Sequence, residues 1–115
     1  MLEINIEHLA DIAFVRCYGR IVAGAEAESL KDAVAREADK RLVIVDLGGV
    51  DAIDARGLGL LVFLQTLSYA LGFDLQITRP APRVAQVFDL TRLDSVLEIT
   101  RPEGAEEPSR AQATA

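Results

Sequence analysis

Apolar and polar residues alternate along the first part of the chain, over residues 2–7 with the sequence LEINIE. A period of two is typical of a strand that buries one face. A second apolar stretch, DIAFVRCY at residues 11–18, predicts another strand, and residues 8–11 between the two predict a hairpin turn. The glycines Gly19 and Gly24 then interrupt the pattern, so the next element is expected to begin after them.

Helical and strand patterns alternate along the rest of the chain. The run Leu42–Leu47 is apolar apart from Asp46, which fits a strand covered on both faces of a sheet. Gly72 is expected to end the helix predicted over Gly57–Leu71. This order predicts an α/β fold in which helices pack on a sheet within a single domain. The predicted elements are a helix over 26–38, a strand over Leu42–Leu47, a helix over Gly57–Leu71, a strand over Phe73–Thr78, a short helix opened by Pro80 and Pro82, and a strand over Val96–Ile99.

The composition changes after residue 100. Residues 101–115, RPEGAEEPSRAQATA, contain no large apolar side chain that could dock on a core. We therefore expect a domain over residues 1–100 followed by a polar, disordered tail over 101–115.

The charge balance narrows the choice of partners. The 115 residues carry a formal net charge of −6, and a phosphate backbone needs a basic surface, so no nucleic-acid partner is expected. No apolar run is long enough to cross a bilayer, and the first residues lack the basic-then-apolar form of a secretory signal. The expectation is a cytoplasmic protein with no membrane partner.

The residues that usually carry catalysis are scarce. His8 is the one histidine and has no serine placed beside it, and Cys17, the one cysteine, lies in an apolar stretch that favours a small buried side chain. No Cys/His cluster has the spacing of a metal site. Gly57 and Gly59 lack the Gly-Lys-Ser/Thr ending of a phosphate-binding loop. We therefore expect no catalytic residue, no metal and no cofactor.

Three aspartates, Asp46, Asp51 and Asp54, are expected near one end of a strand. Such a group can bind a divalent cation or accept a phosphoryl group. The local interpretation is favoured, because each residue has a simpler role. Asp54 would cap the following helix, Asp51 would shape a turn, and Asp46 would need a partner if it is buried.

The long helix is too apolar for an ordinary surface helix. A helical wheel predicts that one side packs on the sheet; it carries Leu60, Phe63, Leu64, Leu67 and Leu71. The opposite side also carries apolar residues, which are either an interaction surface or covered by a neighbouring element. That side carries Leu58, Val62 and Tyr69, beside Gln65 and Thr66.

Arg56 falls in the first turn of this helix, where a cation opposes the helix dipole by about 0.3–1 kcal/mol. One interpretation is a solvated side chain held by Asp51 or Asp54. The other is that Arg56 lies at the centre of a contact surface with another protein, where arginine is a frequent anchor.

Two stretches of the chain are distinctive. The first, LVIVDLGGVDAIDARGLGLL, has an aspartate before a strand-to-helix turn and a Gly-Leu-Gly helix start. The second, PAPRVAQVFDLTRLDSVLEI, contains a Phe-Asp-Leu-Thr-x-Leu-Asp segment. Together with the order of the elements, they resemble the STAS domain of bacterial anti-sigma factor antagonists over residues 2–100. The resemblance implies a mixed β-sheet packed by helices.

The resemblance also implies a function. Members of that family bind an anti-sigma factor, usually a serine-kinase-like regulator, and so release a sigma factor to transcription. The kinase phosphorylates a serine within an Asp-Ser-Ser-Gly pattern at the strand-to-helix turn. The matching residues here are Asp54, Ala55, Arg56 and Gly57, so both serines are absent and Arg56 occupies the phosphoacceptor position. A phosphoserine would bring about −1.5 to −2 charges, whereas Arg56 carries a fixed positive one.

The sequence therefore predicts a non-catalytic binding module for an anti-sigma factor, which phosphorylation at this turn cannot switch. The missing serines fit equally well a STAS subunit of a stressosome, a transporter complex or a ligand sensor. A receiver-like domain with Asp46 as phosphoacceptor is a further alternative, although the acidic pair and lysine of receivers are missing. The apolar outer residues leave a homodimer open. The predicted partner-binding residues are Asp51, Asp54, Ala55, Arg56, Gly57, Leu58, Val62 and Tyr69.

Overall fold

The computed structural model describes residues 2–22 and 24–100 and contains a five-stranded sheet in the order β1-β2-β3-β4-β5. Strand β1 is antiparallel to β2, and the other neighbouring pairs are parallel. The predicted α/β class with a mixed sheet is therefore confirmed, and the tail predicted over 101–115 lies outside the described residues. The elements are β1 (Leu2–Leu9), β2 (Ile12–Ile21), α1 (Ala25–Ala35), β3 (Leu42–Ile53), α2 (Ala55–Leu71), β4 (Asp74–Thr78), α3 (Pro82–Thr91), the 3-10 turn η1 (Leu93–Ser95) and β5 (Ile99–Thr100).

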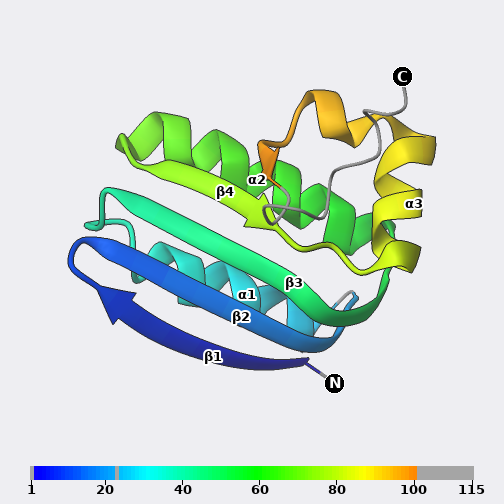
Figure 1. Cartoon of the computed structure of the whole chain (residues 1–115), viewed down its shortest axis with the longest axis horizontal. Helices are drawn as coiled ribbons and strands as arrows, with labels where there is room; N and C mark the ends of the chain where they lie inside the picture. The colour runs from blue at the N-terminus through cyan, green and yellow to red at the C-terminus, as the bar shows by residue number, and fades with distance from the viewer. Residues whose placement is uncertain (1, 23, 101–115) are drawn as a thin grey trace.

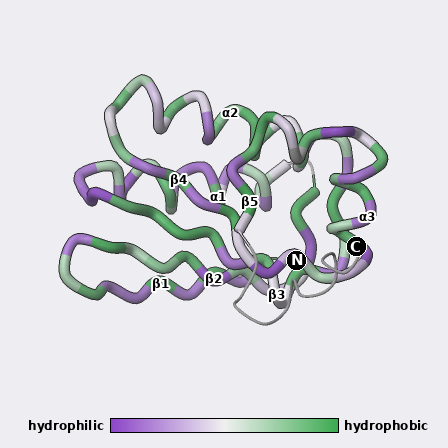
Figure 2. Tube along the Cα trace, turned by 45° about the horizontal axis from the view of Figure 1, so that its top comes forward, coloured by the Kyte–Doolittle hydropathy of each residue, from purple (hydrophilic) through white to green (hydrophobic). Residues whose placement is uncertain are grey.

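The helices are distributed unevenly about the sheet. Helices α1 and α2 lie behind one face of it, and α3 lies beside the ends of the strands (Figure 1). Within the part of the chain that the structure describes, no helix covers the other face, which we call the uncovered face. Hydrophobic and hydrophilic residues alternate along β1 and β2 (Figure 2), as expected for strands with two different surroundings.

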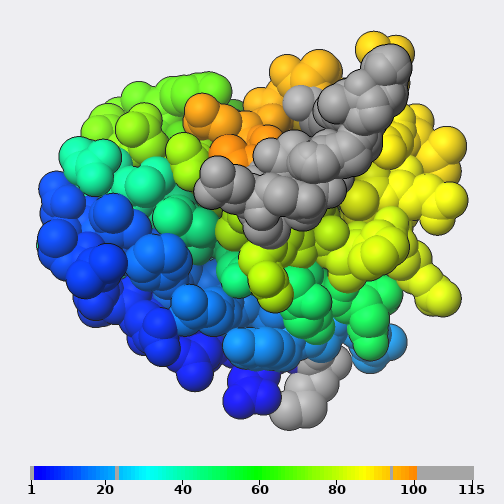
Figure 3. All heavy atoms as spheres, in the orientation of Figure 1, coloured from blue at the N-terminus to red at the C-terminus, as the bar shows by residue number. Residues whose placement is uncertain are grey.

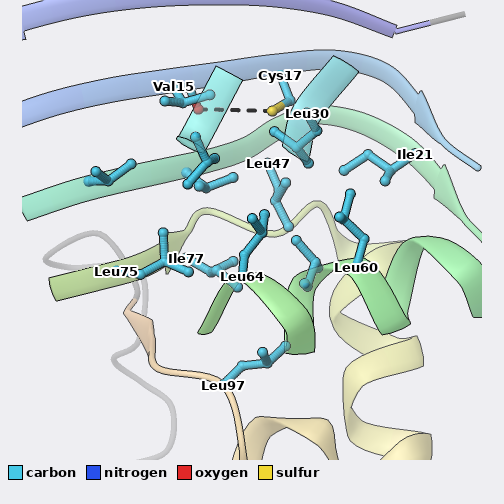
Figure 4. Close-up of a cluster of buried hydrophobic side chains, with 14 of the residues drawn as sticks. Val15, Cys17, Ile21, Leu30, Leu47, Leu60, Leu64, Leu75, Ile77 and Leu97 are labelled. Atoms are coloured by element: carbon cyan, nitrogen blue, oxygen red, sulfur yellow. Dashed lines mark hydrogen bonds between the residues drawn. The ribbon is translucent and has the colours of Figure 1, made fainter. Parts of the chain in front are cut away.

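The core lies between the sheet and the two helices that cover it. Every second residue of the central strands points into it, and leucines from α1 and α2 close it from the other side (Figure 4). Leu60 and Leu64 are buried as predicted. The core residues from β2, β3 and β4 are Ala13, Val15, Cys17, Ile21, Val43, Val45, Leu47, Val50, Leu75 and Ile77.

Strand β3 is longer than the sequence pattern predicted. It was expected to end at Leu47, but it continues to Ile53. Gly48 and Gly49 therefore lie within a strand rather than in a turn, and so does Asp51. The register against β2 shifts at two places, each with an extra residue in β3. A bulge of this kind adds a residue and bends the strand without ending its pairing, so a pair of glycines can be accommodated inside it.

The buried face of α2 is rotated from the predicted one. Phe63 and Leu71, expected in the core, are 48% and 56% exposed, whereas Gln65, expected outside, is only 2% exposed. Burial of Gln65 is tolerated because its amide is paired. Its Oε1 accepts a hydrogen bond from the backbone N–H of Glu98 (2.9 Å), and its Nε2 donates to the carbonyl oxygen of Leu75 (3.5 Å).

The ends of several elements follow the predicted chemistry. Gly72 ends α2 in the left-handed conformation, with φ 82°, and Pro82 lies in the first turn of α3. Helix α1 stops earlier than predicted, at Ala35, and the last strand begins only at Ile99. No helix among the described residues has the length and apolar character needed to cross a membrane.

Candidate functional site

The turn between β3 and α2 is held by two residues that the sequence singled out. Asp54 is the N-cap of α2, and its Oδ1 accepts the backbone N–H of Gly57 at 2.8 Å, as predicted. Gly57 is buried against the end of β2, where an added Cβ would stand 2.3 Å from the carbonyl oxygen of Ile21. These contacts fix the direction in which the residues between Asp54 and Gly57 point.

Ala55 and Arg56 occupy the first turn of α2 and are both exposed. Within the described residues, the Arg56 guanidinium forms no hydrogen bond or ion pair, so the interpretation of an arginine held by Asp51 or Asp54 is not supported. A cation at this end of a helix is unfavourable by about 0.3–1 kcal/mol. Arg56 is thus a solvent-facing cation whose position does not stabilise the fold.

Helix α2 turns a nearly uncharged side to solvent. Arg56, Gly59, Phe63 and Thr66 are all exposed and follow one another at spacings of three or four residues, so they form one line along the helix, which we call the outer stripe. Arg56 is the one charged residue of this helix. Lys31 of α1 lies over the Phe63 ring, 5.9 Å from its centroid. Phe63 is not among the predicted partner-binding residues, because the helical wheel places its ring in the core.

Other predicted partner-binding residues are placed less favourably. Leu58 and Val62 are half-buried and pack against the core, and Gly57 is buried. Tyr69 is 73% exposed, but at about 1.5 Å per residue it lies about 20 Å along α2 from Arg56. The structure therefore brings the turn together with Gly59 and Phe63, rather than with Tyr69.

Asp51 lies on the other side of the turn, close to the start of α3. It is exposed and borders a hollow of about 580 Å³. Arg83 also lines this hollow, so a second cation comes near the turn from a distant part of the sequence. The sequence offered no signal for this approach, because it depends on how α3 packs beside the end of β3. The other residues that line the hollow are Ala52, Ala81 and Pro82.

Asp46 does not join the other two aspartates. It lies within β3 rather than at the strand end, and its carboxylate accepts the backbone N–H of Gly48 at 2.8 Å. Two arginines flank it, with Arg79 Nε at 3.4 Å and Arg16 Nε at 3.9 Å. No three His, Cys, Asp or Glu side chains come together as a metal site in residues 2–22 and 24–100. Asp46 is only partly buried, with 17% of its side chain exposed, and these contacts are its partners.

The remaining chemical candidates lie away from the turn. Cys17 is buried in the core, as predicted, and burial together with the charge of Asp46 raises the pKa of its thiol to about 12. A thiol with this pKa is not nucleophilic at neutral pH. His8 is half-exposed, and its Nε2 lies 2.7 Å from Oε1 of Glu37.

Comparison with known proteins agrees with this architecture. The family model of the STAS domain matches residues 3–105. No curated protein matches the sequence.

Several solved structures share the fold. The unphosphorylated form of the anti-sigma factor antagonist SpoIIAA has a TM-score of 0.72 at 16% identity, covering 96% of this chain and 97% of that one. A phosphorylated form of Bacillus SpoIIAA matches with a TM-score of 0.67 at 15% identity over 90% and 95% of the two chains. An anti-sigma factor antagonist from Mycobacterium paratuberculosis has a TM-score of 0.73 at 17% identity, covering 99% of this chain and 92% of that one. The protein tm1081 of Thermotoga maritima has a TM-score of 0.76 at 21% identity, covering 90% of this chain and 89% of that one.

Proposed function

This chain belongs to the STAS domain family, and on that premise we propose that it is a non-catalytic, cytoplasmic protein-binding module that acts as an anti-sigma factor antagonist. Its partner would be an anti-sigma factor or a serine-kinase-like regulator. The contact would be made by the turn before α2 and by the outer stripe. The observation that carries the proposal is the exposed Arg56 at the head of an uncharged, partly aromatic helix face.

The position of Arg56 has an energetic cost. An exposed cation at a helix N-terminus lowers stability relative to an acidic residue, and the exposed part of an apolar ring gains no stability from burial. Neither Arg56 nor Phe63 supports the core, since both face solvent. Arginine and aromatic side chains at the centre of an interface are frequent anchors of binding energy. A partner that pairs an acidic group with Arg56 and covers Phe63 would offset the electrostatic cost and bury the exposed part of the ring.

The chemistry of the turn also sets how the module would be regulated. The similar protein SpoIIAA occurs in a phosphorylated and an unphosphorylated form. In this chain Ala55 and Arg56 carry no hydroxyl group, so the first turn of α2 offers no acceptor. We infer that binding through this turn is independent of phosphorylation there. The fixed positive charge would select a partner surface that differs in sign from one adapted to a phosphoserine.

The experiment is a calorimetric titration of the full chain with each purified anti-sigma factor of the source organism. Arg56→Glu and Phe63→Ser are each expected to weaken binding by about tenfold, which corresponds to about 1.4 kcal/mol. The matched controls lie at exposed positions near the end of α3: Arg92→Glu makes the same charge change, and Leu90→Ser likewise replaces an exposed apolar side chain with serine. The controls should leave the affinity within about twofold of the wild type.

Two results would contradict the proposal. One is that no anti-sigma factor binds the wild-type chain. The other is that the α2 variants and the α3 controls lose the same affinity, because the binding surface would then lie elsewhere. When the bound partner is a kinase, incubation with ATP should add no phosphate to this turn of the wild type. The Arg56→Ser variant should gain one phosphate, mapped by peptide sequencing to residue 56.

A further inference from the structure

A second concave region lies on the uncovered face of the sheet, away from α2. It is a hollow of about 570 Å³, which is within the range of small-molecule sites. Figure 3 views the molecule from this side, with atoms of β1 and β2 at the surface. Part of its lining comes from β2, β3 and the residue after β4, namely Arg16, Tyr18, Asp46, Gly48, Gly49 and Arg79.

Arg79 is positioned in the hollow at a conformational cost. Its φ is 56°, in the left-handed region that non-glycine residues seldom adopt. The side chain reaches back over Gly48, where an added Cβ would stand 2.9 Å from Arg79 Nη2. Its Nε lies 3.4 Å from Asp46 Oδ1, yet the side chain is 58% exposed. A guanidinium has five N–H donors, so this contact leaves donors for a further anion.

Tyr18 lies on the neighbouring glycine. A Cβ on Gly49 would stand 2.3 Å from Tyr18 Cδ1, so the ring rests on the bare backbone. The bulge in β3 lies at the same place, between the pairs Arg16–Asp46 and Tyr18–Gly49. Tyr18 remains 44% exposed, which leaves one side of the ring available for stacking. The bulge and the two glycines therefore place a guanidinium and an aromatic ring along one short segment of strand.

The charges favour an anion of low charge. The lining contains two arginines and a single aspartate among its charged side chains. Arg16 is also bonded to Glu7, so Arg79 is the cation with donors to spare. Thr78, Thr100 and Gln76 also line the hollow, and their hydroxyl and amide groups can bond to polar atoms of a ligand.

We propose that this hollow binds a small anion that carries a flat ring, with the anionic group on Arg79 and the ring stacked on Tyr18. The anionic group can be the carboxylate of an aromatic acid or the phosphate of a nucleoside monophosphate. The site is independent of the partner surface on α2, because it is built on the opposite face of the sheet.

The test is a titration of the ¹⁵N-labelled full chain followed by NMR. The probes are benzoate, adenosine monophosphate, adenosine and inorganic phosphate. At least one of the two ring-bearing anions should shift the amides of Gly48, Gly49 and Arg79 saturably in the millimolar range. Adenosine and phosphate, which each lack one of the two features, should bind about tenfold more weakly. The stronger of the two ring-bearing probes identifies the anionic group.

Variants separate specific binding from general attraction. Tyr18→Leu and Arg79→Gln should each weaken binding by about tenfold, whereas Tyr18→Phe and Arg79→Lys should retain most of it. Arg92→Gln is the matched control, because Arg92 is also exposed and has a left-handed φ of 61° but does not line the hollow. The proposal is wrong if neither benzoate nor adenosine monophosphate shifts these amides. It is also wrong if phosphate binds as well as both, or if the control weakens binding as much as Arg79→Gln.

Discussion

The backbone of Gly57 presses against the carbonyl oxygen of Ile21, so closely that a Cβ on Gly57 would stand 2.3 Å from that oxygen. Such a distance requires the start of α2 to move away from β2. We expect Gly57→Ala to lower the free energy of unfolding by about 1–3 kcal/mol, measured by urea denaturation.

Gly59 provides the matched control for that change. It lies two residues further along the same helix, and an added Cβ there would meet nothing within 4 Å. Gly59→Ala should therefore raise the free energy of unfolding by about 0.5–1 kcal/mol, because alanine favours the helical backbone. Equal effects of the two substitutions would show that the contact with Ile21 is not what restricts position 57.

Replacing the cation at the start of α2 should stabilise the fold. Arg56→Glu exchanges an unfavourable charge for a favourable one beside the positive end of the helix dipole. The expected gain is about 1 kcal/mol at low salt, decreasing as salt is added. Arg92→Glu makes the same change at the C-terminal end of α3, so it should lower stability instead. Urea denaturation at two salt concentrations measures both, and a loss of stability in Arg56→Glu would reveal a favourable contact of the arginine.

The buried thiol should make stability depend on alkaline pH. Burial raises the pKa of Cys17 from 9.0 to about 12, so between these values the unfolded chain loses the thiol proton while the folded chain keeps it. The unfolded state then binds fewer protons, and stability falls as pH rises, by up to about 1.4 kcal/mol per pH unit from this group. The stability advantage of the wild type over Cys17→Ala should therefore shrink as the pH rises above 9. Denaturation curves recorded at several alkaline pH values test this, and a constant advantage would contradict it.

Gln65 should be important for the attachment of the last strand. Its side chain accepts the backbone N–H of Glu98 at 2.9 Å, just before β5. Gln65→Leu leaves that N–H without its acceptor, which should cost about 1–3 kcal/mol and speed hydrogen exchange at the Glu98 amide. Thr66→Ala is the control, because the Thr66 hydroxyl bonds only to the Val62 carbonyl on an exposed surface; it should change stability by about 0.5 kcal/mol or less. An unchanged exchange rate at Glu98 in Gln65→Leu would contradict the prediction.

Local chemistry accounts for what the sequence could predict. The cap formed by Asp54 and the left-handed stop at Gly72 depend on residues a few positions apart, and both are confirmed. The α/β class follows from the alternation of periods, which each segment carries by itself. These features do not require knowledge of what packs against them.

Features that depend on distant neighbours were missed. The glycine pair in β3 resembles a turn, and only its pairing with β2 makes it a bulged strand. The rotation of α2 could not be predicted because the helix is apolar around most of its circumference, and its orientation involves the Gln65 contact with Glu98. The same applies to the candidate sites. Arg79 follows β4 and reaches Asp46 in β3, so no local sequence pattern predicted the pair.

The four residues at the start of α2, counted from its N-cap, have two separate roles. Asp54 and Gly57 hold the helix in place, while Ala55 and Arg56 between them project outward and contribute nothing to that attachment. Related chains can therefore exchange the two outward residues during evolution at little cost to folding. If the proposed contact is made through this turn, gene duplication followed by change at these two positions would supply domains with one scaffold and different partners.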